Sequence, residues 1–406
     1  MNHDRDFDVL IIGGGPIGGI VAEAIARNHL STMILEEHKS IGQPQHCAGL
    51  ISVNGFRRLG ITPPKSVLQN EVRGATIYSP SGENLTVERS NTQAFVVDRI
   101  CLDRFLVENA TRRGSELQLN TRAKQITIQR DGALVKTETR RNTTRTSEAT
   151  LKGRLVISGE GGQAKLASQV GLGPPNPKMR LYATQFEMSN VRLGRQDLVE
   201  IYFGNFAPGF FAWVIPTGED SARIGLASKV AKSHTYLRHF VSHHPAVASK
   251  LTKARVKEVF GGMVLTGGPS ETTSTDRFLA VGDCAGQTKP TTGGGVITGG
   301  ICARIAGKVA VDSIASEDLS KEFLKKYDKL WRGQLGQEFS SMLRLRTVLN
   351  HTPNSLLDKS LVAAKKSGLE SVIEEKGDID AQSKLIRYAL RNPRIILSFL
   401  FSFLGL

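Results

Sequence analysis

The feature that most constrains this chain is a glycine cluster directly after a short apolar run near the N-terminus. Residues 7–12 predict a β-strand, and Gly13, Gly15 and Gly18 follow in G-x-G-x-x-G spacing, with Pro16 among them. Residues 20–28 predict a helix of small and apolar residues, and residues 31–35 predict a second strand that ends in Glu36. This order of elements is typical of a βαβ unit in a parallel sheet.

Each glycine of this cluster meets a physical requirement of a dinucleotide site. Gly13 permits a tight turn, and Gly15 lets the backbone approach a pyrophosphate at the helix N-terminus. Gly18 lets the helix pack closely on the strand. Glu36 stands about 20 residues further on, where it can accept hydrogen bonds from ribose hydroxyls.

A second motif follows about 270 residues later. Residues 278–281 predict a strand that leads into Gly282 and Asp283, and a glycine-rich loop then opens a helix over residues 296–316. Asp283 can hold a ribityl hydroxyl, and backbone N–H groups of the loop can bind the anionic N1/C2=O edge of a reduced flavin. Two such motifs indicate one FAD bound across a discontinuous domain. The loop residues expected at the cofactor are Gly286, Pro290, Gly293, Gly294 and Gly295.

The remaining patterns predict an α/β chain that is α+β overall. An amphipathic helix is expected from Asp98 to about Arg113, strands of period two are expected in residues 117–152, and strands that alternate with turns are expected in residues 182–262. We therefore expect a Rossmann-type FAD-binding domain, a substrate domain built on an antiparallel sheet, and a helical C-terminal region with a hydrophobic tail. Their predicted ranges are 1–70, 95–175 and 275–317 for the first, 71–94 and 176–274 for the second, and 318–406 for the third.

Further segments carry a resemblance to a known family. Residues 41–50, IGQPQHCAGL, resemble the "IG…P…CxxGL" segment of the geranylgeranyl reductases, which are flavoproteins with the para-hydroxybenzoate hydroxylase-like fold. Asp98-Arg99 resembles the "DR" that opens a helix in these proteins. Residues 155–161 resemble "VIGADG", with Gly159 and Glu160 in place of alanine and aspartate. The resemblance implies that Cys47, Ala48, Arg99, Glu160 and Gly161 contact the cofactor.

Residues 208–216, PGFFAWVIP, resemble the "G-Y-x-W-x-F-P" signature of the same reductases, with Phe211 at the tyrosine position. An aromatic strip on a strand suits an apolar chain as substrate, because it offers a large area without polar groups that need partners. The resemblance implies that Phe211, Trp213 and Pro216 line the substrate. The alternative is that Phe210, Phe211 and Trp213 alternate across a sheet and fill its core.

The resemblance implies an FAD-dependent oxidoreductase that saturates C=C bonds of geranylgeranyl chains in isoprenoid, archaeal-type ether lipid precursors. Hydride would come from N5 of reduced flavin and a proton from the protein. Cys47 is the expected proton donor or substrate gate, with His46 as a competing donor, although a free cysteine is commonly a small buried apolar residue.

Three other functions stay open. The strip also resembles the "WxWxIP" signature of flavin-dependent halogenases, for which Lys65 is the nearby lysine, and a monooxygenase is open on fold alone. The third is a membrane-docked electron-transfer flavoprotein that reduces a quinone.

The net charge of +15 indicates either nucleic acid or an anionic membrane surface as partner. No zinc-finger spacing, RNP-like motif or long basic block favours nucleic acid. The tail, residues 394–406, is rich in Ile, Leu and Phe but shorter than the roughly 20 residues that span a bilayer. We therefore expect a cytoplasmic protein associated peripherally with the inner face of the cell membrane, through the tail and through Lys384, Arg387, Arg391 and Arg394.

Two remaining features concern metals and electrons. His234, His239, His243 and His244 lie close together, but no Cys or acidic residue stands near them, so we expect no metal. A second G-x-G-x-x-G fingerprint for a resident nicotinamide is missing. Electrons are therefore expected from transient contact with ferredoxin or NAD(P)H.

Overall fold

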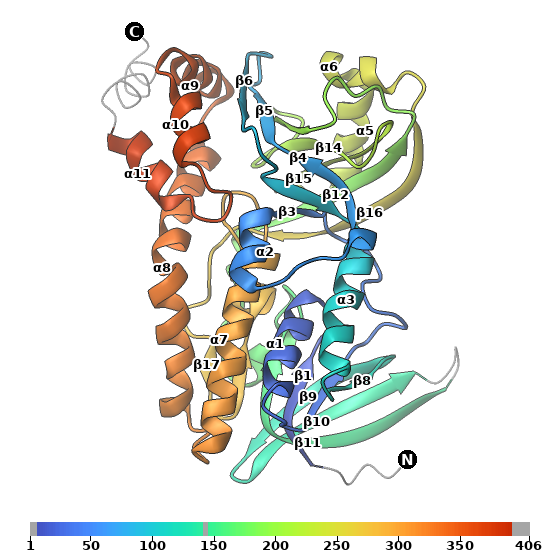
Figure 1. The fold of residues 1–406 in the computed structure, drawn as a ribbon, viewed down its shortest axis with the longest axis vertical. Helices are drawn as coiled ribbons and strands as arrows, with labels where there is room; N and C mark the ends of the chain where they lie inside the picture. Colours follow the sequence, from blue (N-terminus) through green and yellow to red (C-terminus); the bar gives the residue numbers. More distant parts are fainter. Residues whose placement is uncertain (1–5, 141–144, 392–406) are drawn as a thin grey trace.

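The structure is a computed structural model that describes residues 6–140 and 145–391. Two large sheets lie one above the other, and a long helix runs along the side of both (Figure 1). The strands of the first sheet are β1 (Phe7–Ile12), β2 (Thr32–Leu35), β8 (Glu116–Gln118), β9 (Thr121–Gln129), β10 (Gly132–Arg140), β11 (Thr146–Ser158), β17 (Ser274–Thr275) and β18 (Phe278–Ala280).

The first sheet has a parallel centre. Its main order is β17-β18-β11-β1-β2-β8, with β1 parallel to both β11 and β2, whereas β17 is antiparallel to β18 and the branch of β10 and β9 is antiparallel to β11. Val9 and Ile11 of β1 pack against the helices α1 (Pro16–Ala26), α3 (Arg99–Thr111) and α7 (Val296–Ala315). Leu10 and Ile12 face the opposite side, where β10 and α4 (Lys165–Gln169) cover the sheet. Both faces of β1 are therefore buried, as a parallel sheet requires.

The first helix begins earlier than the sequence predicts. We expected it from Ile20, whereas α1 starts at Pro16 with Gly15 as its N-cap. Proline suits the first helical position because its fixed φ matches the helix and its missing N–H would have no partner there. The helix therefore begins directly at the glycine turn.

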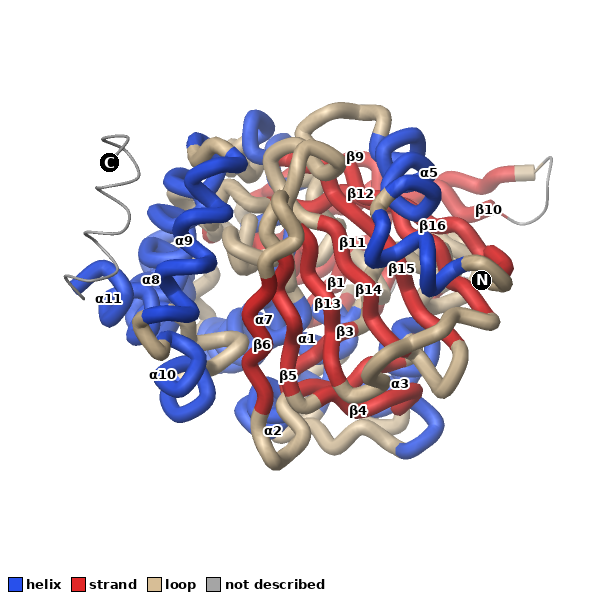
Figure 2. Tube along the Cα trace, turned by 90° about the horizontal axis from the view of Figure 1, so that it is seen from above, coloured by secondary structure: helices blue, strands red, loops and turns tan. Residues whose placement is uncertain are grey.

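The second sheet has the order β16-β12-β15-β14-β13-β5-β6 (Figure 2). We expected it to be antiparallel, and one pairing differs, because β13 runs parallel to β5 with Glu200 opposite Thr76. The hairpin of β5 and β6 comes from a distant part of the chain, and a parallel pairing needs such a long connection. The strands are β5 (Gly74–Tyr78), β6 (Asn84–Glu88), β12 (Arg180–Ser189), β13 (Leu198–Tyr202), β14 (Ala212–Pro216), β15 (Ser221–Ser228) and β16 (Arg255–Leu265).

The two faces of the second sheet have different neighbours. Helix α5 (Ser233–His243) packs on one face, where Leu237 and Phe240 meet Val214 and Ile224. The opposite face carries Trp213 and packs against Ala48. A small third sheet lies near it, and the helix α2 (Val53–Leu59) follows its first strand directly. Its strands are β3 (Leu50–Ser52), β4 (Leu68–Val72) and β7 (Ala94–Val97).

The C-terminal helices share the core of the first sheet. Tyr327, Trp331 and Phe339 of α8 (Lys321–His351) are buried in the same cluster as α1 and α7. Within residues 6–140 and 145–391 no helix combines the length and the apolar character needed to span a bilayer. The predicted hydrophobic tail lies outside the described residues. The other helices are α6 (Pro245–Ala248), α9 (Asn354–Lys366), α10 (Leu369–Lys376), α11 (Ser383–Arg391) and the short 3₁₀ turns η1 (Lys65–Val67), η2 (Pro177–Met179), η3 (Ser249–Leu251) and η4 (Gly282–Ala285).

Candidate cofactor and substrate site

The glycine turn has the close contacts that its spacing predicts. Gly13 adopts a left-handed conformation with φ of 97°. A Cβ on Gly18 would lie 1.9 Å from the Gly13 carbonyl oxygen, so only glycine fits between α1 and β1. Gly15 differs, because a Cβ there would meet no described atom within 4 Å beyond its chain neighbours. The N-terminus of α1 is thus open beside Gly15, and its N–H groups can receive an anion.

Glu36 lies beside this open turn. Its Oε2 accepts a hydrogen bond of 2.7 Å from the N–H of Gly14, and its Oε1 accepts one of 2.9 Å from the N–H of His38. The carboxylate is buried at the end of β2. An open helix N-terminus with an adjacent carboxylate fits the pyrophosphate and ribose of a dinucleotide.

The second motif meets the first in space. β18 pairs with β11, which pairs with β1, so the ends of these parallel strands lie at one edge of the sheet. A Cβ on Gly282 would lie 2.9 Å from Cγ1 of Ile17, the residue after Pro16. Burial raises the pKa of the neighbouring Asp283, and the Arg99 guanidinium partly opposes this shift. The structure therefore brings the two halves of the predicted FAD site together.

The loop after Asp283 has the turns that glycine permits. Gly286 ends η4 with φ of 66°, and Gly293 has φ of 71°. The Pro290 carbonyl accepts a hydrogen bond of 3.1 Å from Nε of Arg346. Gly295 is the N-cap of α7, and a Cβ there would lie 2.9 Å from Oδ1 of Asp283. The glycine run therefore lies directly against the carboxylate predicted to hold the ribityl chain.

Arg99 connects this region to Cys47. Its Nε and one terminal nitrogen bind Asp103 at 3.1 and 3.0 Å. Burial alone would lower the pKa of Arg99. The Asp103 carboxylate and the Cys47 sulfur together raise it by more than burial lowers it, so the pKa lies above its ordinary value. Arg99 is thus a permanent cation beside Cys47 and Asp283. The contact of Arg99 with the cofactor remains a prediction.

Glu160 has a structural role that explains its length. Its carboxylate accepts hydrogen bonds from the N–H groups of Leu166 and Ala167 at 2.8 and 2.9 Å, in the first turn of α4. It also accepts one of 3.1 Å from the hydroxyl of Ser158. Gly161, with φ of 79°, forms the turn between them. The predicted cofactor contacts of Glu160 and Gly161 remain predictions.

The segment around Cys47 contacts the second sheet. The Cys47 sulfur accepts a hydrogen bond of 3.4 Å from the N–H of Gly49. His46 is exposed, and its Nδ1 lies 2.6 Å from the carbonyl oxygen of Gly261 in β16. The Ala48 carbonyl accepts a hydrogen bond of 2.9 Å from Arg223 in β15. Cys47 is therefore held between the predicted cofactor site and the second sheet.

The aromatic strip lies on the sheet face that packs against Ala48. Trp213 and Phe211 belong to this face, together with Phe210, which stacks on Phe211 with a centroid distance of 4.1 Å. Trp213 lies over Gly225, where a Cβ would come within 2.6 Å of the indole ring. The three rings therefore do not alternate between the faces of the sheet but share one buried apolar cluster, and their contact with a substrate remains a prediction. Pro216 is buried at the end of β14.

Polar atoms on this face have no partner in the described part of the chain. They are Nε1 of Trp213 and both amide atoms of Gln185, a residue that is 3% exposed. Gln185 pairs with Gly225 across the strands and therefore lies beside Trp213.

Arg223 is a residue that the motifs did not indicate. It is 2% exposed and binds Glu187 at 2.8 Å, the Ala48 carbonyl at 2.9 Å and the Val97 carbonyl at 3.0 Å. The signal in the sequence was one arginine within the buried strand SARIGLAS. Buried charges are paired, so this arginine had to have partners from elsewhere in the chain.

Lys65 is exposed in η1, and the histidine cluster lies on and directly after α5, which packs on the sheet face opposite Trp213. His239 and His243 stack on each other at 4.3 Å, and His244 packs against the Tyr202 ring at 4.9 Å. In the ranges 6–140 and 145–391, no three His, Cys, Asp or Glu side chains are grouped as a metal site.

Comparisons with known proteins agree with this geometry. A family model described as an FAD binding domain matches residues 6–300. The digeranylgeranylglycerophospholipid reductase of Methanocaldococcus jannaschii is 32% identical over 391 residues, which cover 94% of this chain and 97% of the reductase. FAD is therefore the cofactor of this fold, and the residues around the glycine turn fit it.

Solved structures share the fold. A geranylgeranyl bacteriochlorophyll reductase-like protein of Thermoplasma acidophilum has a TM-score of 0.85 at 24% identity, covering 97% of this chain and 98% of that protein. A flavin-dependent brominase has a TM-score of 0.72 at 15% identity, covering 95% and 98%. The chain belongs to the family of FAD-binding proteins that includes the digeranylgeranylglycerophospholipid reductases.

Proposed function

We propose that this protein is an FAD-dependent reductase that saturates C=C bonds of geranylgeranyl chains in isoprenoid ether lipid precursors. The observation that carries the proposal is the near full-length similarity to a reductase named for such a lipid. The halogenase likeness supports less, because at 15% identity it concerns the fold alone and Lys65 is exposed in η1.

The chemistry of an isolated alkene explains the apolar face. Such a bond has no carbonyl to polarise it, so the protein contributes by positioning the chain and excluding water. Phe211 and Trp213 provide large apolar surfaces for this purpose, and the strand around them is buried. Bound FAD, once reduced, supplies the hydride.

Cys47 is our proposed proton donor to the second alkene carbon. It is the thiol of the segment that contacts the second sheet, and it lies beside the Arg99 cation. His46 is the weaker candidate, because it is exposed and its Nδ1 is engaged by the Gly261 carbonyl.

The direct test is mass spectrometry of a lipid substrate. The chemically reduced holoprotein is incubated with an unsaturated digeranylgeranyl ether phospholipid, and each saturated bond should add two hydrogens to the product. A control with oxidised holoprotein should give no mass change. If no isoprenoid lipid gains hydrogen while a quinone is reduced, the protein is an electron-transfer flavoprotein and the proposal fails.

We also propose transient partners. Lys384 and Arg387 are exposed on α11, and in the sequence this helix leads toward the apolar tail. Basic residues near an anionic leaflet each contribute about 1 kcal/mol of attraction. Sedimentation with vesicles that contain anionic lipid should therefore capture the full chain, and deletion of residues 395–406 should weaken capture more than it lowers FAD content.

The proposed electron donor is ferredoxin or NAD(P)H, in transient contact with the protein. Anaerobic titration of the bound flavin with NADPH or with reduced ferredoxin identifies the reductant.

A further inference from the structure

Lys289 organises the loop that contains the glycine run. Its N–H donates to the Gly294 carbonyl at 3.0 Å, and its carbonyl accepts from the N–H of Gly293 at 2.7 Å. Its side chain, which is 9% exposed, lies against the same loop, since a Cβ on Gly294 would be 2.8 Å from Lys289 Cε. Lys289 thus supports this loop with both its backbone and its side chain.

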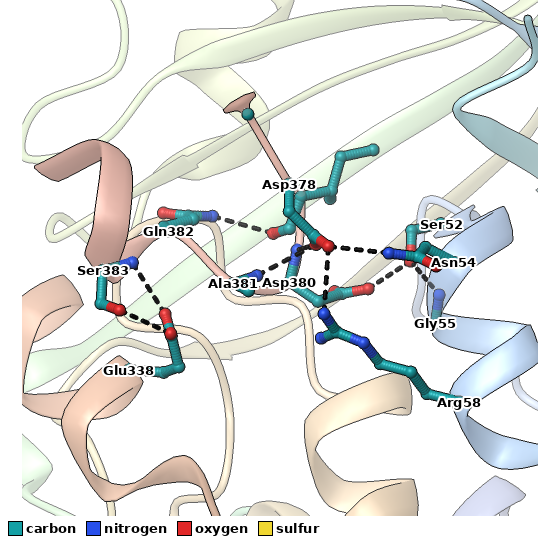
Figure 3. A network of polar contacts seen from close by, with 12 residues as sticks. Ser52, Asn54, Gly55, Arg58, Glu338, Asp378, Asp380, Ala381, Gln382 and Ser383 are labelled. Carbon is teal, nitrogen blue, oxygen red and sulfur yellow. Dashed lines mark hydrogen bonds and ion pairs between the residues drawn. The ribbon is translucent and has the colours of Figure 1, made fainter. Parts of the chain in front are cut away.

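The partner of Lys289 comes from the C-terminal part of the chain. Its Nζ binds Oδ1 of Asp380 at 2.7 Å, and the Asp380 side chain is 2% exposed. The other oxygen of Asp380 accepts a hydrogen bond from Ser52, whose hydroxyl also accepts the N–H of Gly55 at 2.8 Å and so caps α2 (Figure 3). A buried ion pair therefore joins the cofactor loop to the segment between α10 and α11.

That segment, residues 378–383, is held at both ends. At its start, Asp378 accepts hydrogen bonds from Asn54 at 2.8 Å and Arg58 at 3.1 Å, both on α2 (Figure 3). At its end, the Ser383 hydroxyl donates to Glu338 on α8 at 2.6 Å.

A second contact ties the middle of the segment to the cofactor loop. The Thr291 hydroxyl donates to the side chain of Gln382 at 2.8 Å. Residues 378–383 therefore bind α2, α8 and the cofactor loop itself, although the matched FAD-binding family model ends at residue 300.

We propose that Lys289 and Asp380 are a positioning pair for bound FAD, through which residues 378–383 hold the glycine loop in place and neutralise its buried cation. The charge balance has a measurable consequence. An unpaired cation in a buried loop favours negative charge nearby, and reduction of a flavin adds negative charge at its N1 edge. Removing only the Asp380 charge should therefore make the bound flavin easier to reduce.

The experiment measures the two-electron reduction potential of FAD in the holoprotein, together with its FAD content and absorption spectrum. Asp380→Asn keeps the shape of the side chain and removes its charge. We expect the flavin equilibrium to shift at least tenfold toward the reduced form, which is a rise of about 30 mV for two electrons. Lys289→Met combined with Asp380→Asn removes both charges and should return the potential to the wild-type value.

Asp378→Asn is the matched control, because it weakens the same segment without leaving Lys289 unpaired. Its potential should equal that of the wild-type protein. A wild-type potential in Asp380→Asn, or an equal shift in Asp378→Asn, overturns the proposal. If Asp380→Asn does not retain FAD, the double variant should recover it, and failure to recover FAD also overturns the proposal. These readouts need no lipid, so they stand apart from the test of the reductase activity.

Discussion

Replacing Arg223 by methionine tests how the Cys47 segment is fixed to the second sheet. Methionine retains an unbranched apolar stem but removes the guanidinium. Arg223 is 2% exposed, and its guanidinium makes hydrogen bonds to Glu187, Gln69 and the carbonyls of Ala48 and Val97. The substitution leaves the Glu187 carboxylate without its cation and two carbonyls without this donor.

The expected loss of stability follows from these contacts. Removing one partner of a fully buried ion pair costs about 3–5 kcal/mol, and the Glu187 side chain that is left behind here is 20% exposed, which moderates the loss. The unpaired carbonyls act in the same direction and are part of the same loss. Glu187 retains one hydrogen bond of 3.1 Å from Thr217, which places the expected value in the lower half of this range.

Urea unfolding of the apoprotein, followed by tryptophan fluorescence, measures the change in the free energy of unfolding. Arg195→Met is the matched control. Arg195 binds Asp197 at 2.7 Å and Glu88 at 2.6 Å, but its side chain is 47% exposed. Exposed pairs are screened by water and contribute little, so this variant should unfold close to the wild-type midpoint. Equal losses in the two variants, or a loss below about 1 kcal/mol for Arg223→Met, would refute the reasoning.

Three further predictions concern the site. Gly15→Ala should lower FAD content with little change in apoprotein stability, because a Cβ there enters open space at the helix N-terminus. Gly18→Ala should instead destabilise the apoprotein, because its Cβ would lie 1.9 Å from the Gly13 oxygen. Measurements of FAD content and of thermal unfolding distinguish the two effects. Cys47→Ala should retain FAD but reduce the alkene at least tenfold more slowly in single-turnover assays, and a wild-type rate would exclude Cys47 as proton donor. Burial alone would raise the pKa of Asp378. Its hydrogen bonds and the Arg58 charge lower the pKa by more than burial raises it, so the folded pKa lies below the ordinary 3.8. Its contribution to stability is present above that value and is lost as the pH falls through the folded pKa, so the urea midpoints of Asp378→Asn and wild type should converge on acidification from pH 6 toward pH 3.

The glycine motifs were predictable from the sequence because their requirements are local. Gly18 must pack on Gly13, and the two residues are only five positions apart in the sequence. The same holds for the helix that starts at Arg99, which is capped by the Asp98 side chain next to it. In such cases spacing alone determines which atoms meet.

The missed features depend on distant parts of the chain. Arg223 binds a carbonyl 175 positions away, and Lys289 binds a carboxylate 91 positions away. No periodicity or short motif specifies such pairs, because each residue taken alone also suits an exposed surface. The parallel pairing of β5 with β13 was missed for the same reason. The departure at Glu160 was visible in the sequence, but its cause, the reach to α4, required the structure.

The discontinuous cofactor site has a consequence for synthesis on the ribosome. Gly13 and Glu36 emerge early, Asp283 follows much later, and Asp380 comes near the end of the described chain. A nascent chain that lacks the last segment therefore lacks part of the loop support described above. Contacts between such distant residues also slow folding, since long loops must close before they form. FAD capture should thus be a late event in the biogenesis of this protein and a sensitive sign that synthesis and folding are complete.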